Sequence, residues 1–181
     1  MENYQELPQV SFGQAVKQGF RKILSFKGRS RRSEFWWFIL ALYLIVMVLS
    51  FAYDLLLPVL ASTIVGICIS ALYIPAMARR LHDRNHCAAL PILQWLLNGA
   101  FNLYLIFSGY IEELQSVNFS EKTIERLVSD PIVISLSIGS VVVSFVLLVL
   151  LCLDGKKEPN RYGPSPKYIE KVIVNTEETI A

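Results

Sequence analysis

Charged residues and cysteines are scarce in this sequence. Asp, Glu, Lys and Arg make up 18% of its 181 residues, whereas a typical soluble domain holds about 25%. The three cysteines are odd in number and irregularly spaced, which argues against a disulfide framework. The sequence also lacks an internal repeat, a low-complexity tract, a glycine-rich phosphate-binding loop and a nucleic-acid-binding motif. We therefore expect no cofactor and no nucleic-acid partner.

Apolar residues, by contrast, account for 54% of the chain, and its mean hydropathy is +0.45. A soluble chain with room for one domain would struggle to hide so much apolar surface, whereas a bilayer can solvate it. The first long apolar run begins near Phe35 and is too long for the hydrophobic region of a signal peptide. We therefore interpret it as a membrane span.

Four apolar segments are long enough to be spans, since about 20 helical residues cross the ~30 Å hydrocarbon core. The first holds no charge between Trp36 and Tyr53, and Asp54 and Pro58 mark a tight turn after it. We predict an all-α fold, an integral membrane four-helix bundle over residues 35–153. The predicted spans are residues 35–57, 60–78, 87–110 and 132–153, and a polar loop, residues 111–131, separates the last two.

The N-terminal segment, residues 1–34, carries the pattern of a further helix. Ser11 is a typical N-cap residue, and apolar residues recur behind it at steps of three and four. Basic residues occupy the rest of the helix surface. A basic amphipathic helix over residues 11–27 suits the membrane interface. The alternative is a helix that packs on the cytoplasmic face of the protein itself.

Basic residues predict the orientation of the spans. Of the 17 Lys and Arg residues, 15 lie before the first span, between the second and third, or in the tail, residues 154–181. The other two lie in loop 111–131, beside five acidic residues. Because Lys and Arg are enriched in cytoplasmic loops, we expect both termini to be cytoplasmic and this loop to lie outside.

Three polar motifs share the predicted cytoplasmic face. They are Phe26-Lys27-Gly28-Arg29 with Arg32-Ser33-Glu34-Phe35-Trp36, then Arg79-Arg80-Leu81-His82-Asp83, and finally Asn160-Arg161-Tyr162-Gly163-Pro164. In this order and around these spans, they resemble the domain of unknown function 805 family, which consists of small bacterial inner-membrane proteins. The resemblance covers roughly residues 12–166, and it departs from the family pattern at residues 87–89, where Cys-Ala-Ala replaces a Ser-Gly-Trp-like sequence. It implies a fold and a location in the bacterial inner membrane, and it implies no reaction.

Residues 79–86, which we call the arginine knot, combine three arginines, one aspartate and two histidines. Asp83 follows Arg79 by four residues and Arg80 by three, spacings that allow pairing on a helix. One interpretation is a cytoplasmic clasp, in which Asp83 and Glu34 bridge arginines of different motifs and the tail packs over them. A compatible alternative is an anionic-headgroup site, because arginine pairs bind phosphates well and juxtamembrane basic residues add about 1 kcal/mol each. The residues assigned to either role are Arg29, Arg32, Glu34, Arg79, Arg80, His82, Asp83, Asn160 and Arg161.

A metal site is a weaker hypothesis for the same stretch. His82 and His86 are four residues apart, which places two imidazoles on one helix face, and Cys87 adjoins them. Without a fixed fourth ligand, these residues do not lead us to predict a metal. Cys87 as a nucleophile with a histidine base lacks an orienting group and an oxyanion site, so we predict no catalytic residues.

A stripe of amides marks the third predicted span. Gln94, Asn98 and Asn102 follow one another at four-residue steps and therefore share a helix face. Polar side chains in a bilayer face other helices or a wet cavity. We interpret the stripe as interhelical hydrogen bonding, with a solute path as the alternative.

These observations support three functional hypotheses. The first is a non-enzymatic scaffold, assembly or membrane-stress component, whose partners are membrane lipids, among them anionic headgroups, and a second copy or another membrane protein. The second is a small oligomeric transporter or channel subunit, motivated by the amide stripe. The third is a lipid- or metal-dependent membrane enzyme, motivated by the arginines and histidines of the knot.

Overall fold

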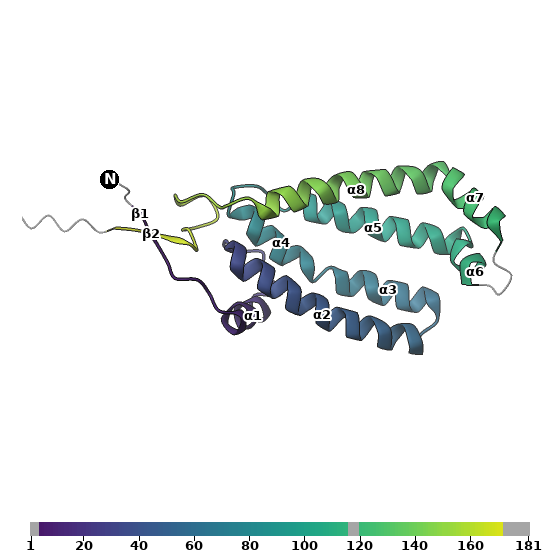
Figure 1. Cartoon of the computed structure of the whole chain (residues 1–181), viewed down its shortest axis with the longest axis horizontal. Helices are drawn as coiled ribbons and strands as arrows, with labels where there is room; N and C mark the ends of the chain where they lie inside the picture. The colour runs from purple at the N-terminus through teal and green to yellow at the C-terminus, as the bar shows by residue number, and fades with distance from the viewer. Residues whose placement is uncertain (1–3, 116–119, 172–181) are drawn as a thin grey trace, which may run out of the picture.

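The computed structural model describes residues 4–115 and 120–171, so parts of the predicted N-terminal segment, of loop 111–131 and of the tail lie outside the described residues. Within them the chain is mostly helical (Figure 1). At most 22% of each apolar window is buried inside the protein, so most of this apolar surface faces outward. This is the architecture of a multi-pass membrane protein. The four described stretches long and apolar enough to cross a membrane are Arg32–Leu56, Val59–His82, Ala89–Phe107 and Pro131–Cys152.

The spans form two helix pairs that meet at one end of the bundle. Helices α2 (Arg32–Leu56) and α3 (Val59–Ser70) make one pair, and α5 (Ala89–Phe107) and α8 (Pro131–Cys152) make the other. Helix α4 (Tyr73–His82) contacts α2, α5 and α8. We call the end at α4 the clasp end and the opposite end the loop end (Figure 1). The buried apolar core consists of Phe35, Phe38, Leu42, Ala76, Leu81, Leu147 and Leu151.

The second span, predicted over residues 60–78, lies within the stretch Val59–His82 and contains a break between α3 and α4. Pro75 causes the break, because proline has no N–H to donate and its ring clashes with the carbonyl four residues before it. The turn between α3 and α4 tightens, so that the Ala71 N–H bonds the Cys68 carbonyl at 3.3 Å. The carbonyl of Ile67, the usual partner of that N–H, accepts instead from the Ser70 hydroxyl at 2.7 Å and the Trp95 indole at 2.9 Å.

Helix α1 (Phe12–Arg21) begins as predicted at Ser11. The Ser11 hydroxyl accepts from the Gln14 N–H, and the Gln14 side chain accepts from the Ser11 N–H, which is a capping box. The helix ends earlier than the predicted residue 27, because the chain turns away after Arg21 toward α4. α1 packs on α2 at Gly19, where a Cβ would overlap the Phe38 ring.

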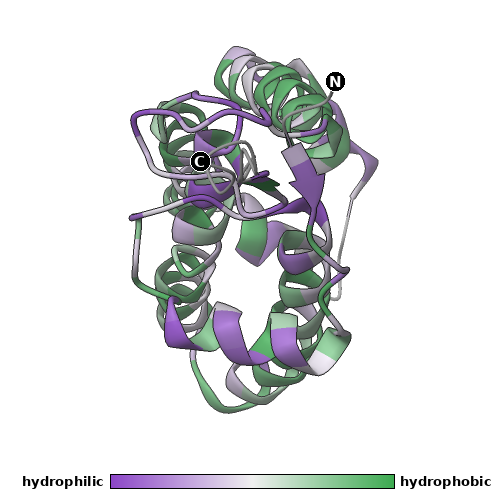
Figure 2. Ribbon diagram, turned by 90° about the vertical axis from the view of Figure 1, so that its left-hand side faces the viewer, coloured by the Kyte–Doolittle hydropathy of each residue, from purple (hydrophilic) through white to green (hydrophobic). Residues whose placement is uncertain are grey.

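The two described chain ends lie side by side at the clasp end. Strand β1 (Tyr4–Glu6) pairs antiparallel with β2 (Tyr168–Glu170), an element that the all-α prediction missed. The Lys167 ammonium lies 3.5 Å from Glu6 and 3.4 Å from Asp154, which strengthens this junction. Figure 2, viewed from this end, shows hydrophilic strands and tail over the ends of the mainly hydrophobic helices.

The loop end carries two short helices, α6 (Tyr110–Gln115) and α7 (Glu121–Ser129). The Asp130 carboxylate caps α8 by accepting from the Ile132 and Val133 N–H groups at 2.8 and 3.3 Å. It also accepts from the Tyr104 hydroxyl at 2.6 Å and the Tyr110 hydroxyl at 3.0 Å, so one side chain ties α5, α6 and α8 together.

Candidate functional site

Asp83 lies at the centre of the buried cluster at the clasp end. Its two carboxylate oxygens accept from different arginines: Oδ1 from Arg29 Nε at 2.9 Å and Oδ2 from Arg80 Nη1 at 2.7 Å. None of these three side chains is more than 4% exposed. Gly155 of the tail lies against the carboxylate, where a Cβ would overlap it. Three segments therefore meet at one carboxylate: the connection before α2, the end of α4 and the tail.

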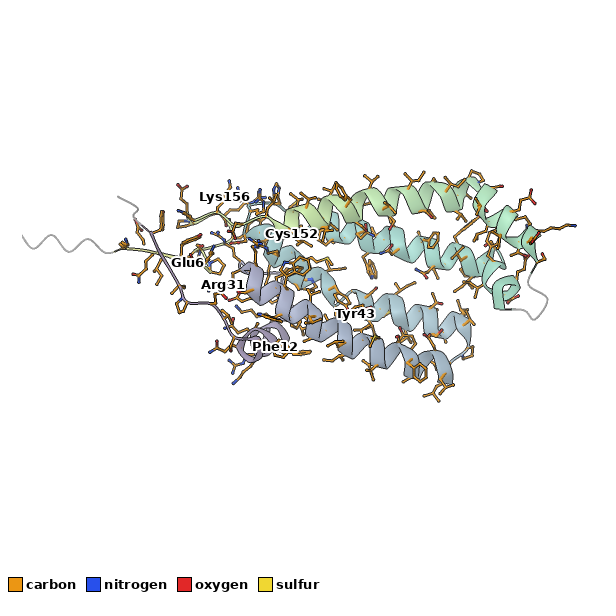
Figure 3. All side chains as sticks on the ribbon, in the orientation of Figure 1. Glu6, Phe12, Arg31, Tyr43, Cys152 and Lys156 are labelled. Atoms are coloured by element: carbon orange, nitrogen blue, oxygen red, sulfur yellow. The ribbon has the colours of Figure 1, made fainter. Side chains whose placement is uncertain are left out.

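The remaining Arg29 donors bind four backbone carbonyls, three of them in the tail. Nη1 donates to the Glu158 carbonyl at 2.9 Å and to the Gly163 carbonyl at 3.2 Å. Nη2 donates to the Lys156 carbonyl at 2.5 Å and to the Asp83 carbonyl at 3.3 Å. Figure 3 labels Lys156 of the tail and Arg31, close to Arg29 in the sequence, and shows both at the clasp end. One guanidinium group therefore fixes the path of the tail across the end of α4.

Arg80 is fully buried and caps α8. Its Nε donates to the Leu151 carbonyl at 3.1 Å, and its Nη2 donates to the Leu153 carbonyl. The last carbonyls of a helix have no partner within it, and the C-terminus of a helix favours a positive charge. Arg80 therefore satisfies α8 while it holds Asp83.

Arg79 takes part in a separate set of bonds. Its Nη1 donates to the carbonyls of Lys22 (2.6 Å) and Ser25, in the connection after α1. Its own carbonyl accepts from the Ser30 N–H at 3.0 Å. Asp83 hydrogen-bonds Arg29 and Arg80 rather than Arg79, which the sequence spacing also allowed as a partner.

The tail motif stacks onto the knot through aromatic and amide contacts. The Tyr162 ring lies parallel to the His82 ring, with centroids 3.7 Å apart and 5° between the planes. His82 Nδ1 faces the Gly28 carbonyl at 3.2 Å, and the Asn160 amide donates to the His82 carbonyl at 2.8 Å. The Arg161 guanidinium lies 4.8 Å from the centre of the Tyr162 ring. The first, second and third motifs are thus in direct contact.

Two predicted clasp residues lie outside this cluster. Arg32 is about half exposed and pairs with Asp154 at 3.6 Å. Glu34 accepts from the Arg31 N–H at 3.2 Å and from the Ser30 hydroxyl at 3.3 Å, so it caps α2. Its charge also acts on Arg79 of the second motif, and a direct bridge between them stays a prediction. Sequence reasoning missed the role of Arg31, which is buried and donates to the Pro8 carbonyl at 2.8 Å.

The metal candidates do not assemble a ligand set. His82 is engaged with Gly28 and Tyr162, while His86 and Cys87 are exposed. Among residues 4–115 and 120–171, no group of three or more His, Cys, Asp or Glu side chains is placed to hold a metal ion.

The charged groups of the cluster are buried, and neighbouring charges and carbonyl dipoles compensate their loss of hydration. Burial raises the pKa of Asp83, while the guanidinium groups of Arg29 and Arg80 oppose this change. The two cations outnumber the one carboxylate, and carbonyl oxygens of the tail and of the α8 C-terminus compensate the difference. The donors of these arginines point at groups of the chain itself, so the cluster can hold segments together.

A second polar region, which we call the inter-hairpin cleft, lies between the two helix pairs toward the loop end. It is a cavity of about 390 Å³ between α2, α3 and α5. A cavity of about 150 Å³, which shares Ser70 and Asn98 with it, adjoins it and includes Gln94. The cleft is lined by Tyr53, Asp54, Ser62, Thr63, Gly66, Ile67, Ser70, Asn98, Gly99 and Asn102.

The amide stripe forms hydrogen bonds and also lines this space. The Gln94 amide donates to the Ser140 hydroxyl at 2.9 Å, which in turn donates to Asn98 Oδ1 at 2.8 Å. The Asn102 amide donates to the Asn98 carbonyl at 2.8 Å. Asn98 and Asn102 are nevertheless exposed on the cleft side of α5. The sequence did not reveal the facing residues on α2 and α3, because helix pairing is not visible in a single sequence.

Comparison with known proteins connects these motifs to one family. The family model described as "Protein of unknown function (DUF805)" matches residues 23–164, which include the first, second and third motifs. No curated protein and no solved structure matches the chain.

Proposed function

This chain belongs to the DUF805 family, and we propose that it is a non-enzymatic scaffold, assembly or stress-response component of the bacterial inner membrane. The observation that carries the proposal is the buried cluster around Asp83, whose arginines bind the chain's own carboxylate and carbonyl groups. Motif residues used in this way hold the fold together. We assign them the role of a clasp.

The proposed topology places the clasp end in the cytoplasm. The positive-inside rule supports it, since 15 of the 17 basic residues lie on segments of that side. Helix α1 would then lie at the membrane interface, with the exposed rings of Phe12 and Phe20 at the acyl boundary. Labelling with a membrane-impermeant thiol reagent tests this topology. In a variant whose Cys68, Cys87 and Cys152 are replaced by serine, the cysteine of Arg161→Cys must react only after the cytoplasmic side is opened. The cysteine of Glu121→Cys must react in intact cells.

Lipids would contact the exposed rim of the clasp, by which we mean the surface at Arg32. Arg29, Arg79 and Arg80 are buried and occupied, so an anionic headgroup would meet the half-exposed Arg32 instead. We propose that lipid phosphates bind at the rim, where they would add to membrane anchoring, and that the buried knot itself is structural.

Photo-crosslinking in native membranes tests the assembly role. A photoreactive residue replaces Phe51 on α2 or Phe145 on α8, both exposed on outward helix faces. We expect crosslinks to a second copy or to one recurrent membrane protein. The same probe at Leu151, which is buried, is the matched control and should give none. Lipid adducts alone at both exposed positions would contradict the proposal.

A small oligomeric transporter or channel subunit is the second candidate, and the inter-hairpin cleft favours it. Polar side chains that face lipid at membrane depth are costly, so a polar cavity of about 390 Å³ among the spans must hold water or be covered by protein. Replacing Asn98 and Asn102 by leucine in reconstituted vesicles should abolish any solute flux. Unchanged flux would remove this candidate.

A further inference from the structure

We propose that the inter-hairpin cleft binds a small organic cation, a protonated amine, which enters from the loop end. This ligand would be the solute of the transporter or channel subunit proposed above as the second candidate. Its physiological meaning rests on that proposed function. The charge, the hydrogen-bonding capacity and the size of the cleft all favour such a ligand.

The charge of the lining favours a cation. Asp54 is the only charged residue among the residues that line the cleft, and the adjoining cavity has none. Asp54 lies exposed near the end of α2, and no described residue forms a hydrogen bond or ion pair with its carboxylate. An anion would meet a negative group and no basic side chain there. A cation gains a carboxylate partner at the mouth.

Two serine hydroxyl groups of the cleft, those of Ser62 and Ser70, are set to accept hydrogen bonds. A serine hydroxyl has one proton to donate and two acceptor positions. Ser62 donates to the Val59 carbonyl at 3.0 Å, and Ser70 donates to the Ile67 carbonyl at 2.7 Å. With both protons used inside α3, the acceptor positions of these oxygens remain for a donor in the cleft. An ammonium group has only donors, so it complements them.

The inner end of the cleft is also electronegative. Just beyond, in the adjoining cavity, the side-chain oxygen of Gln94 is buried and has no hydrogen-bond partner among the described residues. Both ends of the polar space therefore attract positive charge.

The size of the cleft selects an organic cation over a bare metal ion. The volume, about 390 Å³, lies within the range of about 300–1,000 Å³ typical of small-molecule sites. A water molecule occupies about 30 Å³ of liquid, so an alkali-metal ion would leave most of the space to solvent. Tyr53 adds an aromatic wall, and aromatic rings attract cations. Its hydroxyl faces Gly66, where a Cβ would lie only 3.2 Å away, so glycine keeps this part of the cleft open.

The test is a binding titration of the full-length protein in nanodiscs. n-Butylammonium is the probe, with sodium chloride and sodium butyrate at the same ionic strength as comparison solutes. We expect saturable binding of n-butylammonium that weakens about tenfold in Asp54→Asn, about 1.4 kcal/mol. Asp54 makes no hydrogen bond that the substitution would remove, so the variant should melt like the wild type.

Two further variants separate the site from a general effect of charge. Glu125→Gln removes an exposed acid of α7 at the same end that does not line the cleft, and it should bind the probe like the wild type. Tyr53→Phe should retain binding, whereas Tyr53→Leu should weaken it. Equal losses in Asp54→Asn and Glu125→Gln would overturn the proposal. So would displacement of the probe by equimolar sodium, or binding of butyrate with equal affinity.

A flux measurement distinguishes failure of the site from failure of transport. Asp54-dependent binding without n-butylammonium uptake into proteoliposomes would establish the site and refute the transporter role. Uptake that is identical in the wild type and Asp54→Asn would overturn the site and leave transport standing.

Discussion

Replacing Asp83 by alanine tests whether the arginine knot is structural. The carboxylate lies 2.8 Å from the Arg29 guanidinium and 2.7 Å from that of Arg80, and all three side chains are buried. Alanine would leave two buried cations beside each other with no anion between them. Breaking a buried ion pair costs about 3–5 kcal/mol. Because both arginines also bind carbonyls, we expect a loss of about 3 kcal/mol, a large share of a total stability of about 5–15 kcal/mol.

Two measurements report this loss of stability. One is the yield of monodisperse protein after mild detergent extraction, and the other is the midpoint of thermal unfolding in the same detergent. Asp154→Ala is the matched control, because Asp154 is also an acid at the clasp end. It is about half exposed and lies 3.6 Å from Arg32 and 3.4 Å from Lys167. Exposed pairs contribute at most about 1 kcal/mol, so this variant should be extracted in normal yield.

Normal yield and an unchanged melting midpoint for Asp83→Ala would refute the structural role of the knot. Equal losses in both variants would show that this end of the protein is sensitive to any change of charge. In that case the buried geometry around Asp83 would have no special importance.

The remaining predictions concern α1, the loop end and the tail. Gly19→Leu would displace the Phe38 ring that occupies its Cβ position, so α1 should detach from α2 and become sensitive to protease. The Tyr104 hydroxyl, with the other donors, holds the pKa of Asp130 below its usual value of 3.8. The stability that Asp130 contributes is therefore complete above the unfolded-state pKa of about 3.9 and is lost as the pH falls through the lower folded pKa. Melting midpoints from pH 5 to 2.5 should consequently fall less in Asp130→Asn than in the wild type. Gly155→Ala should lower the yield of extracted protein, because the methyl group would overlap the Asp83 carboxylate.

Much of the helical framework could be predicted from the sequence, because hydropathy alone determines where apolar runs can cross a bilayer. The break in the second span was missed although Pro75 was visible, since its apolar run continues through the proline. The pairing of β1 with β2 has no sequence signal, because three-residue strands are too short for a period of two to be recognised.

The sequence identified most residues of the candidate site, but it did not predict which hydrogen bonds they form. Spacing placed Asp83 within reach of Arg79 and Arg80, yet its second partner is Arg29, from a segment 54 residues earlier. Most acceptors of Arg29, Arg79 and Arg80 are backbone carbonyls. Every residue has a carbonyl, so its availability depends on where helices end and cannot be read from residue identity. The amides of the cleft were recognised from their spacing, whereas the acceptor role of Ser62 and Ser70 required the hydrogen bonds of α3.

The use of tail carbonyls by the buried arginines ties folding to the order of biosynthesis. Arg29 emerges from the ribosome first and Asp83 later, while the carbonyl acceptors of the tail extend to Gly163. At about 5–20 residues per second, the 80 residues from Arg84 to Gly163 take about 4–16 s to synthesise. During that interval Arg29 lacks its acceptors in the tail and Arg80 lacks its acceptors at the end of α8, although both already have Asp83. A polypeptide interrupted before Leu151 would lack the carbonyls of α8 and the tail that accept from Arg29 and Arg80. We therefore expect the clasp to close only after the third motif has been translated.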